Sequence, residues 1–435
     1  MAKITVDFSE TTSKIKPLHG VGQPPCAGID FSYFKYLTNA GIPHSRLHDM
    51  GIDLLGGFVD MYRIFPDFNK DANDPASYDF VFTDLLIEAL VKAGVTPHWR
   101  LGVTIENYAH IKAYSIYPPS DFKKWAKISE NIIRHYTEGW ANGFCFDMKY
   151  WEIWNEPDNT NGVPTNPCWG GTKEGFFEFY TIVSKHLKSC FPDYMIGGYG
   201  SCGFYNITGS DGSFGMCSDQ THYFIEFMDE FLTHIKKENA PLDFFSWHSY
   251  DPSIEYNRLY ARYARRRLDE EGFKNTLTDC NEWNCRVELR GTAKHAAITV
   301  SQMMVFQDEP VDTAAFYDAR IGRSVYGSLF NPMTKEPLPA YYAFTAFNRL
   351  YTLGNECLTT LDDNRLYALS ASDGKSGAIV IANPSDSYIK LDIDLVKDAK
   401  AVKCYVTDLK GNDKPSSIPE YIGKDTVISI IYDIV

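Results

Sequence analysis

The chain has 435 residues, of which 44% are hydrophobic and 23% are charged, values typical of a globular protein with room for one large domain and an appended module. Its 56 acidic and 42 basic residues give a net charge of −14, and no long run of Lys or Arg occurs, so nucleic acid and anionic membranes are poor partners. The ten cysteines follow neither a disulfide-framework nor a zinc-ligand spacing, which predicts reduced thiols and no metal or other cofactor.

The N-terminal segment alternates apolar and polar side chains from Ala2 to Phe8, as a strand does. We expect residues 1–14 to join a sheet in the C-terminal part of the chain. The segment lacks the apolar core of a signal peptide, and no stretch of the chain is long and apolar enough for a membrane-spanning helix. These features predict a cytoplasmic protein.

Residues 15–352 alternate short apolar strands with longer amphipathic segments, a pattern typical of βα units and a parallel sheet. We predict strands over Leu18–Gly22, His44–His48, Thr96–Leu101, Tyr150–Asn155, Met195–Gly200, Phe244–Tyr250, Leu277–Glu282 and Ala314–Asp318. Helices are expected over Phe80–Ala93, Asp121–Tyr136, Gly175–Phe191, Gln220–Glu238, Tyr256–Glu271 and Thr292–Gln307. The first helix is expected to begin after an Asp79 cap and to end before Gly94. Eight such units predict an α/β protein with a (β/α)₈ TIM barrel.

Residues 353–435 have a different character. Short alternating segments are separated by Asp-Gly, Asn-Pro and Gly-Asn turns, which predicts a small C-terminal β-sandwich. Its expected strands are Leu366–Ser370, Gly377–Ala382, Ser387–Ile393, Val402–Asp408 and Thr426–Ile431.

Two glutamates follow predicted barrel strands at their carboxyl ends. Glu156 comes directly after Asn155 and before Pro157, which ends the strand, and Glu282 ends a strand far downstream. The carboxyl ends of barrel strands carry the chemistry in this fold, and glycoside hydrolysis needs two carboxyl groups. The pair therefore predicts a glycoside hydrolase.

The segments around these glutamates resemble glycoside hydrolase family 39, a barrel family of clan A that includes β-xylosidases and α-L-iduronidases. The resemblance is carried by residues 151–157, 169–192, 246–250 and 281–284. It implies that Glu156 is the acid/base and Glu282 the nucleophile. The acid must hold a proton near neutral pH, and the nucleophile must stay ionised. Asn155 matches the residue of the clan that donates to the 2-hydroxyl of the sugar.

Further substrate contacts are expected around the two glutamates. His248 and Tyr250 stand two apart on one strand and so face the same side, and Tyr250 is the expected donor to Glu282. The Arg-x-His of the family matches Arg46, expected to support the nucleophile, and His48, expected to touch sugar hydroxyls. The other candidate substrate residues are Trp283, Asp318, Arg320 and Arg323; Arg320 can instead pair with Asp318 as scaffold.

We expect a retaining exo-glycosidase that acts on short oligosaccharides or glycosides by double displacement, with β-D-xylosidase as the first choice. Other family 39 specificities stay open, namely α-L-arabinofuranosidase, β-galactosidase and β-glucosidase. An α-L-iduronidase is less favoured, because Tyr250 stands where those enzymes carry Lys. A non-catalytic sugar-binding barrel is the alternative to an enzyme. A metal-dependent hydrolase is not favoured, because the sequence shows no cluster of metal ligands. A homo-oligomer is compatible with the sequence.

Overall fold

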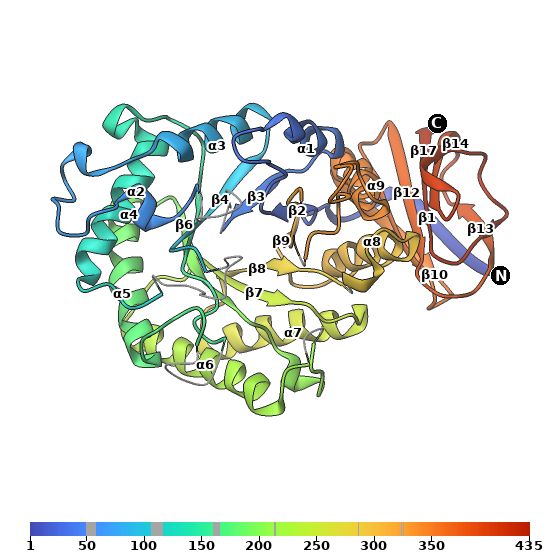
Figure 1. The fold of residues 1–435 in the computed structure, drawn as a ribbon. Coiled ribbons are helices and arrows are strands. Elements are labelled where there is room, and N and C mark those ends of the chain that lie inside the picture. The colour runs from blue at the N-terminus through green and yellow to red at the C-terminus, as the bar shows by residue number, and fades with distance from the viewer. Residues whose placement is uncertain are drawn as a thin grey trace.

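The computed structural model describes residues 1–48, 58–105, 116–159, 166–212, 215–285, 287–322, 324 and 326–435. Its centre is a closed barrel of eight parallel strands, which confirms the predicted (β/α)₈ fold (Figure 1). The barrel strands are β2 (Gly20–Gly22), β3 (His44–Leu47), β4 (Thr96–Leu101), β5 (Tyr150–Ile153), β6 (Met195–Ser201), β7 (Phe244–Ser249), β8 (Leu277–Trp283) and β9 (Thr313–Phe316).

Helices surround the barrel and follow its strands. They are α1 (Lys35–Ala40), α2 (Met61–Ile64), α3 (Val81–Lys92), α4 (Phe122–Glu138), α5 (Lys173–Cys190), α6 (Ser218–Lys237), α7 (Ile254–Glu271), α8 (Ala293–Asp308) and α9 (Pro339–Leu353). The six predicted helices agree with these bounds to within about two residues, whereas α1, α2 and α9 were not predicted. None of the helices in the described ranges is long and apolar enough to cross a membrane.

Side-chain caps explain where several of these helices begin. The side chains of Asp121, Thr172, Ser253 and Thr292 each accept a hydrogen bond from the backbone N–H three residues later. Helix α3 differs from the prediction, because its N-cap is Phe80, although Asp79 accepts from the N–H of Val81 (3.1 Å).

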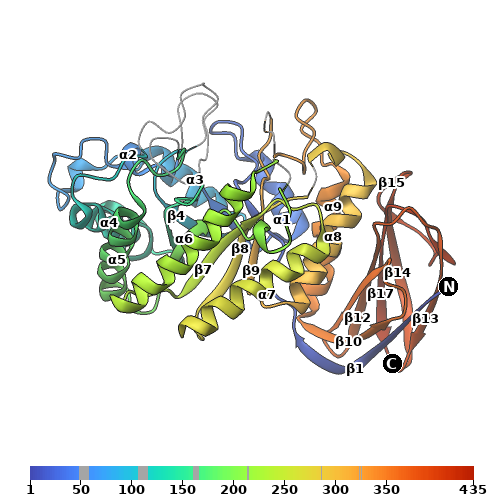
Figure 2. The same cartoon turned by 90° about the horizontal axis from the view of Figure 1, so that it is seen from below.

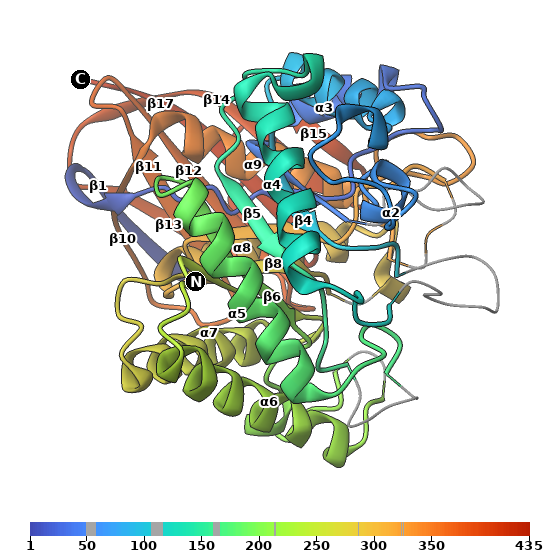
Figure 3. The same ribbon diagram turned by 90° about the vertical axis from the view of Figure 1, so that its left-hand side faces the viewer.

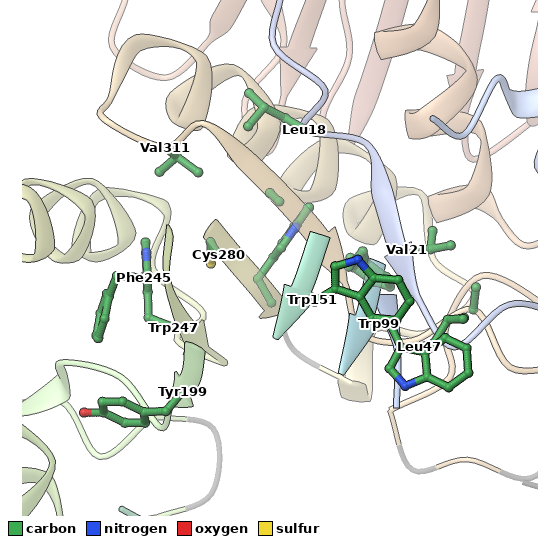
Figure 4. Close-up of a cluster of buried hydrophobic side chains, with 14 of the residues drawn as sticks. Leu18, Val21, Leu47, Trp99, Trp151, Tyr199, Phe245, Trp247, Cys280 and Val311 are labelled. Carbon is green, nitrogen blue, oxygen red and sulfur yellow. The ribbon is translucent and has the colours of Figure 1, made fainter. Parts of the chain in front are cut away.

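The hydrophobic core of the barrel domain lies between the strands and the helices. Alternate residues of each strand point outward, and these include the buried rings of Trp99 on β4, Trp151 on β5 and Trp247 on β7 (Figure 4). The outward side chains pack against the helices, so the inward side chains of the same strands can be polar. The candidate site described below is built on these inward positions.

The C-terminal domain is a nine-stranded sheet in the order β15-β14-β17-β12-β11-β10-β1-β13-β16. Its strands are β1 (Ala2–Lys14), β10 (Asn355–Leu361), β11 (Tyr367–Ser372), β12 (Ser376–Asn383), β13 (Ile389–Leu395), β14 (Ala399–Asp408), β15 (Gly411–Pro415), β16 (Tyr421–Ile422) and β17 (Thr426–Ile434). The N-terminal strand β1 pairs antiparallel with β10 and parallel with β13. Ile4 and Val6 of β1 share one hydrophobic core with apolar side chains of strands that stand far apart in this order. The sheet is therefore strongly curved and encloses the core.

Figures 1 and 2 show this sheet beside α8 and α9, and Figure 3, viewed from the opposite side of the barrel, places it behind α4 and α5. Polar side chains such as Gln307 and Arg349 join the domains. Gln307 at the end of α8 donates to the backbone carbonyl of Lys14 (2.9 Å) and to Glu356 (2.7 Å). Arg349 of α9 forms a two-bond ion pair with Asp413 (2.8 and 2.6 Å).

Candidate active site

The chain makes a sharp turn where β5 ends, and this turn presents Glu156. Trp154 (φ 70°) and Glu156 (φ 47°) both adopt the left-handed backbone conformation. The N–H of Trp154 still donates to Leu101 of β4, and the N–H of Glu156 donates to Gly200 of β6. Such strained residues persist only where the surroundings hold them, and they concentrate at functional sites. The turn therefore fixes Glu156 at the lip of the barrel.

Three side chains donate hydrogen bonds to the carboxylate of Glu156. Nδ1 of His248 lies 2.8 Å from Oε1, Nδ2 of Asn159 lies 2.8 Å from Oε2, and the thiol of Cys168 lies 3.8 Å from Oε2. The side chain of Glu156 is 18% exposed, whereas His248 is fully buried. Glu156 is thus held on both oxygens and still reaches the solvent-facing mouth.

An irregularity in β8 turns Glu282 into the barrel. The pairing of β7 with β8 shifts between Trp247 and His248, so that Cys280 and Glu282 lie opposite successive residues of β7. Asn281 and Glu282 both face the interior as a result, and Trp283 returns to the outer face. Bulges of this kind re-aim side chains next to active sites.

Glu282 is buried among donors. Its Oε1 accepts from Arg46 (2.6 Å) and His48 (2.9 Å), and its Oε2 accepts from the hydroxyl of Tyr250 (2.7 Å). Burial alone would raise its pKa, but the contacts with His248, His48 and Arg46 outweigh burial and hold the pKa well below its usual value. This carboxylate is therefore ionised at neutral pH, as a nucleophile must be.

Arg46 is the central cation of the site. Its guanidinium donates to Glu152 (2.6 Å), to Glu282 (2.6 Å) and to the side-chain oxygen of Asn155 (2.7 Å). Because a guanidinium only donates, the oxygen of Asn155 must face Arg46, and the amide NH₂ is directed elsewhere. Asn155 also lines the cavity described below. This orientation leaves its NH₂ as the group that can donate into the cavity.

Glu152 balances the charge of Arg46 beneath the reacting groups. It also accepts from the hydroxyl of Ser246 (2.6 Å) and from Asn281 (2.8 Å), so both carboxylate oxygens are satisfied. Burial would raise its pKa, but Arg46 and these hydrogen bonds lower the pKa below its ordinary value. The ionised pair holds Arg46 in place under Glu282.

Aromatic side chains hold the outer donors of Glu282. The ring of His48 stacks on Tyr317 at 5.6 Å, and its Nδ1 lies 3.1 Å from Arg100. The ring of Tyr250 lies 5.4 Å from that of Tyr326. These contacts limit the rotation of both donors.

The two carboxylates lie close together across His248. One oxygen of Glu156, one oxygen of Glu282 and a ring nitrogen of His248 lie within 4.8 Å of one another, and His248 Nδ1 is 3.6 Å from Glu282. The described residues form a cavity of about 240 Å³ at this point. It is lined by His48, Ile105, Asn155, Glu156, Asn159, Cys202, Tyr205, Met216, Gln220, Phe224, Tyr250, Glu282 and Tyr326.

The same three groups, Glu156, His248 and Glu282, are spaced closely enough to share a metal ion. Arg46 lies 2.6 Å from Glu282 and would repel a cation there. The donor set fits a pair of reacting carboxyl groups better than a metal centre.

The structure brings together most of the residues expected at the site from the sequence. These are Glu156, Glu282, Asn155, His248, Tyr250, His48 and Arg46. His48, expected on sugar hydroxyls, lies against Glu282 and also lines the cavity.

Three candidates do not line the cavity. For Trp283, the expected contact with substrate is corrected by its position. It packs against Phe306 of α8 and Phe316 of β9 on the outer face of the barrel, because strand alternation opposes it to Glu282. Arg320 pairs with Asp318 (2.5 Å) beyond the end of β9, and neither is among the cavity residues above. Arg323 lies outside the described residues.

Several site residues escaped the sequence analysis. Glu152 carried a usable signal, because a charged residue inside an otherwise apolar strand needs a buried partner. Asn159 and Cys168 carried none, because their contacts with Glu156 are tertiary and leave no pattern in the sequence.

Comparisons with known proteins identify relatives of this chain. A model of the glycosyl hydrolases family 39 matches residues 29–265. The beta-xylosidase of Geobacillus stearothermophilus is 22% identical over 370 residues, which cover 76% of this chain and 66% of that protein, so the chain spans just under two thirds of that relative.

Two solved structures share the fold over the whole chain. A glucosidase from Croceicoccus marinus has a TM-score of 0.80 at 20% identity, covering 100% of this chain and 99% of its own. A monomeric beta-xylosidase from Caulobacter crescentus has a TM-score of 0.70 at 15% identity, with coverage of 100% and 99%. At these identities the structures establish the architecture, a barrel with an accessory sheet.

Proposed function

Because this chain belongs to the glycosyl hydrolases family 39, we propose that it is a retaining exo-glycosidase that releases a terminal sugar from short oligosaccharides or glycosides. β-D-Xylosides are the first choice of substrate, as the name of the Geobacillus relative suggests. Glu156 is the acid/base and Glu282 the nucleophile.

The spacing of the two carboxylates carries the proposal. Retaining enzymes place the two groups about 5–5.5 Å apart, whereas inverting enzymes need roughly 6.5–9.5 Å to admit a water. An oxygen of Glu156 and an oxygen of Glu282 lie within 4.8 Å of one another, which is nearer to the retaining spacing than to the inverting one. The spacing favours direct attack by Glu282 on the sugar.

In the first step Glu282 attacks the anomeric carbon, and Glu156 gives its proton to the departing oxygen. The bond to the leaving group breaks as the bond to Glu282 forms, which yields a covalent glycosyl-enzyme. Arg46, His48 and Tyr250 keep Glu282 ionised and aimed beforehand. The NH₂ of Asn155 donates to the sugar 2-hydroxyl, a bond that strengthens in the transition state.

In the second step Glu156, now ionised, takes a proton from water. The resulting hydroxide attacks the anomeric carbon and displaces Glu282. Two inversions restore the original configuration of the sugar. His248 contacts both carboxylates (2.8 and 3.6 Å) and so keeps them at a fixed separation through the cycle.

The cavity favours a neutral sugar. Among the described residues that line it, none is Lys or Arg, and the ammonium or guanidinium that a uronic acid would pair with is missing from that set. Tyr250, at the position of the iduronidase Lys, donates to Glu282 (2.7 Å). An iduronidase is accordingly the least favoured of the family specificities.

A panel of aryl glycosides tests the sugar, and NMR of the first-formed product tests the mechanism. We expect fastest hydrolysis of the β-D-xyloside and a first product with the configuration of the substrate. Fastest hydrolysis of the arabinofuranoside, galactoside or glucoside would reassign the specificity. An inverted product would refute the retaining mechanism, and sugar binding without turnover of any glycoside would support the non-catalytic alternative.

A further inference from the structure

The acid/base carries an unusual donor on one of its oxygens. Oε2 of Glu156 accepts from Asn159 (2.8 Å) and from the thiol of Cys168 (3.8 Å), while His248 occupies Oε1. Cys168 is 2% exposed, so its contact with Glu156 is shielded from solvent. Asn159, unlike Cys168, is among the described residues that line the cavity.

Hydrogen bonds around residues 166–169 hold Cys168 beside Glu156. Asn166 donates to the carbonyl of Pro157 (2.7 Å), and its side-chain oxygen accepts from the N–H groups of Cys168 (2.8 Å) and Trp169 (2.9 Å). The indole of Trp154 donates to the carbonyl of Cys168 (2.8 Å). Residues before and after Glu156 in the sequence thus hold the backbone of Cys168 in place.

The chemistry of sulfur suits this position. Each hydrogen bond to an ionised carboxylate stabilises that form and makes the acid release its proton more readily. A thiol is a weak donor, so it fixes the carboxylate while stabilising the ionised form less than a hydroxyl or an ammonium would. An acid that must hold its proton in one step and accept one in the next needs this balance.

We propose that Cys168 is a positioning residue that, together with Asn159, holds Oε2 of Glu156 and sets the pH above which the acid form is lost. This inference rests on the proposed role of Glu156 as acid/base. It assigns a function to a buried thiol that is not among the described residues lining the cavity.

The test is the dependence of kcat/KM on pH for Cys168→Ala with an aryl β-D-xyloside. Loss of the donor destabilises ionised Glu156, so the basic limb moves to higher pH, by about half a unit for so weak a bond. Cys168→Ser should show the same shift, because the shorter C–O bond leaves its hydroxyl beyond hydrogen-bond reach of Oε2. Asn159→Ala should move the limb in the same direction.

Cys202→Ala is the matched control, because it removes a second buried thiol, and the backbone N–H of Cys202, which donates to Asp158 (3.2 Å), is kept in the variant. Its basic limb should stay at the wild-type pH. The proposal is overturned if the limb stays in place for Cys168→Ala and Cys168→Ser, or moves equally in the control. If one Cys168 variant fails to fold, the other decides.

Glu156→Gln separates this inference from the function on which it rests. A basic limb that persists in Glu156→Gln would refute Glu156 as the acid/base. A limb that vanishes there while both Cys168 variants keep the wild-type profile would refute only the positioning role.

Discussion

Replacing Glu156 by Gln removes the proposed acid and base while keeping their shape. A glutamine oxygen can retain the bond from His248 (2.8 Å), and the new NH₂ then faces Asn159, whose amide can turn to present its oxygen. The side chain is 18% exposed. We therefore expect the variant to fold with a stability within about 1 kcal/mol of the wild type.

The loss of activity should depend on the leaving group. For a natural disaccharide the departing oxygen needs a proton, and a missing general acid costs about 10²–10⁴-fold, or roughly 3–5 kcal/mol on the barrier. An activated aryl group leaves without a proton, so the first step survives. The second step lacks its base, and the glycosyl-enzyme should accumulate.

The assay compares xylobiose with an activated aryl xyloside in single-turnover and steady-state measurements. We expect a burst of the aryl alcohol followed by slow turnover, and near loss of xylobiose hydrolysis. The basic limb of the pH profile should vanish, while the acidic limb, which reports Glu282, should persist. Equal losses on both substrates with the basic limb retained would refute the assignment of Glu156.

Three other changes test the rest of the site. Glu282→Ala should abolish turnover, and azide should partly restore it by attacking from the vacated side; substantial residual activity without azide would exclude Glu282 as nucleophile. Tyr250→Phe removes a 2.7 Å donor to ionised Glu282, worth about 1.5–3 kcal/mol, so the pKa of Glu282 and the acidic limb of kcat/KM should rise by about 1–2 pH units. An unmoved limb would contradict the ionised state derived from these contacts. Burial, with the nearby charge of Glu156 adding to it, raises the pKa of Asp158 to about 7, so the folded state holds a proton that the unfolded state releases above about pH 4. As the pH rises from about 4 to 7, the free energy of unfolding of the wild type should therefore fall relative to that of Asp158→Asn, by up to about 1.4 kcal/mol per pH unit. Urea titrations of both proteins at pH 5 and at pH 8 measure this. An equal difference between the two proteins at both pH values would show that Asp158 is not protonated in the fold.

The barrel was predictable because its signals are local. Strands such as Thr96–Leu101 have identical bounds in the sequence analysis and in the structure, since apolar runs and turn residues define them over a few positions. The short helices α1 and α2 were not predicted, because six- and four-residue helices offer too few positions for a periodic pattern.

The site was predictable where one residue at a strand end decides it. Glu156 and Glu282 fall at such ends, and the fold gathers strand ends at one face. Trp283 faces outward by strand alternation once Glu282 faces inward. The inward orientation of both Asn281 and Glu282 depends on the irregular pairing between β7 and β8, a tertiary feature that a single segment does not encode. The approach of Cys168 to Glu156 depends likewise on a loop closed by Asn166.

The pairing of β1 has a consequence for the order in which the molecule is assembled. Ile4 lies opposite Leu361 on one side and Ile393 on the other, so Ile4 is synthesised more than 350 residues before the residues with which it pairs. Pairings between such distant residues form slowly, because a long loop must close first. The barrel is synthesised in the interval and can reach its native packing while the apolar side of β1 is still without partners. The accessory sheet is then completed last, and until its strands pair, β1 is open to a chaperone or a protease.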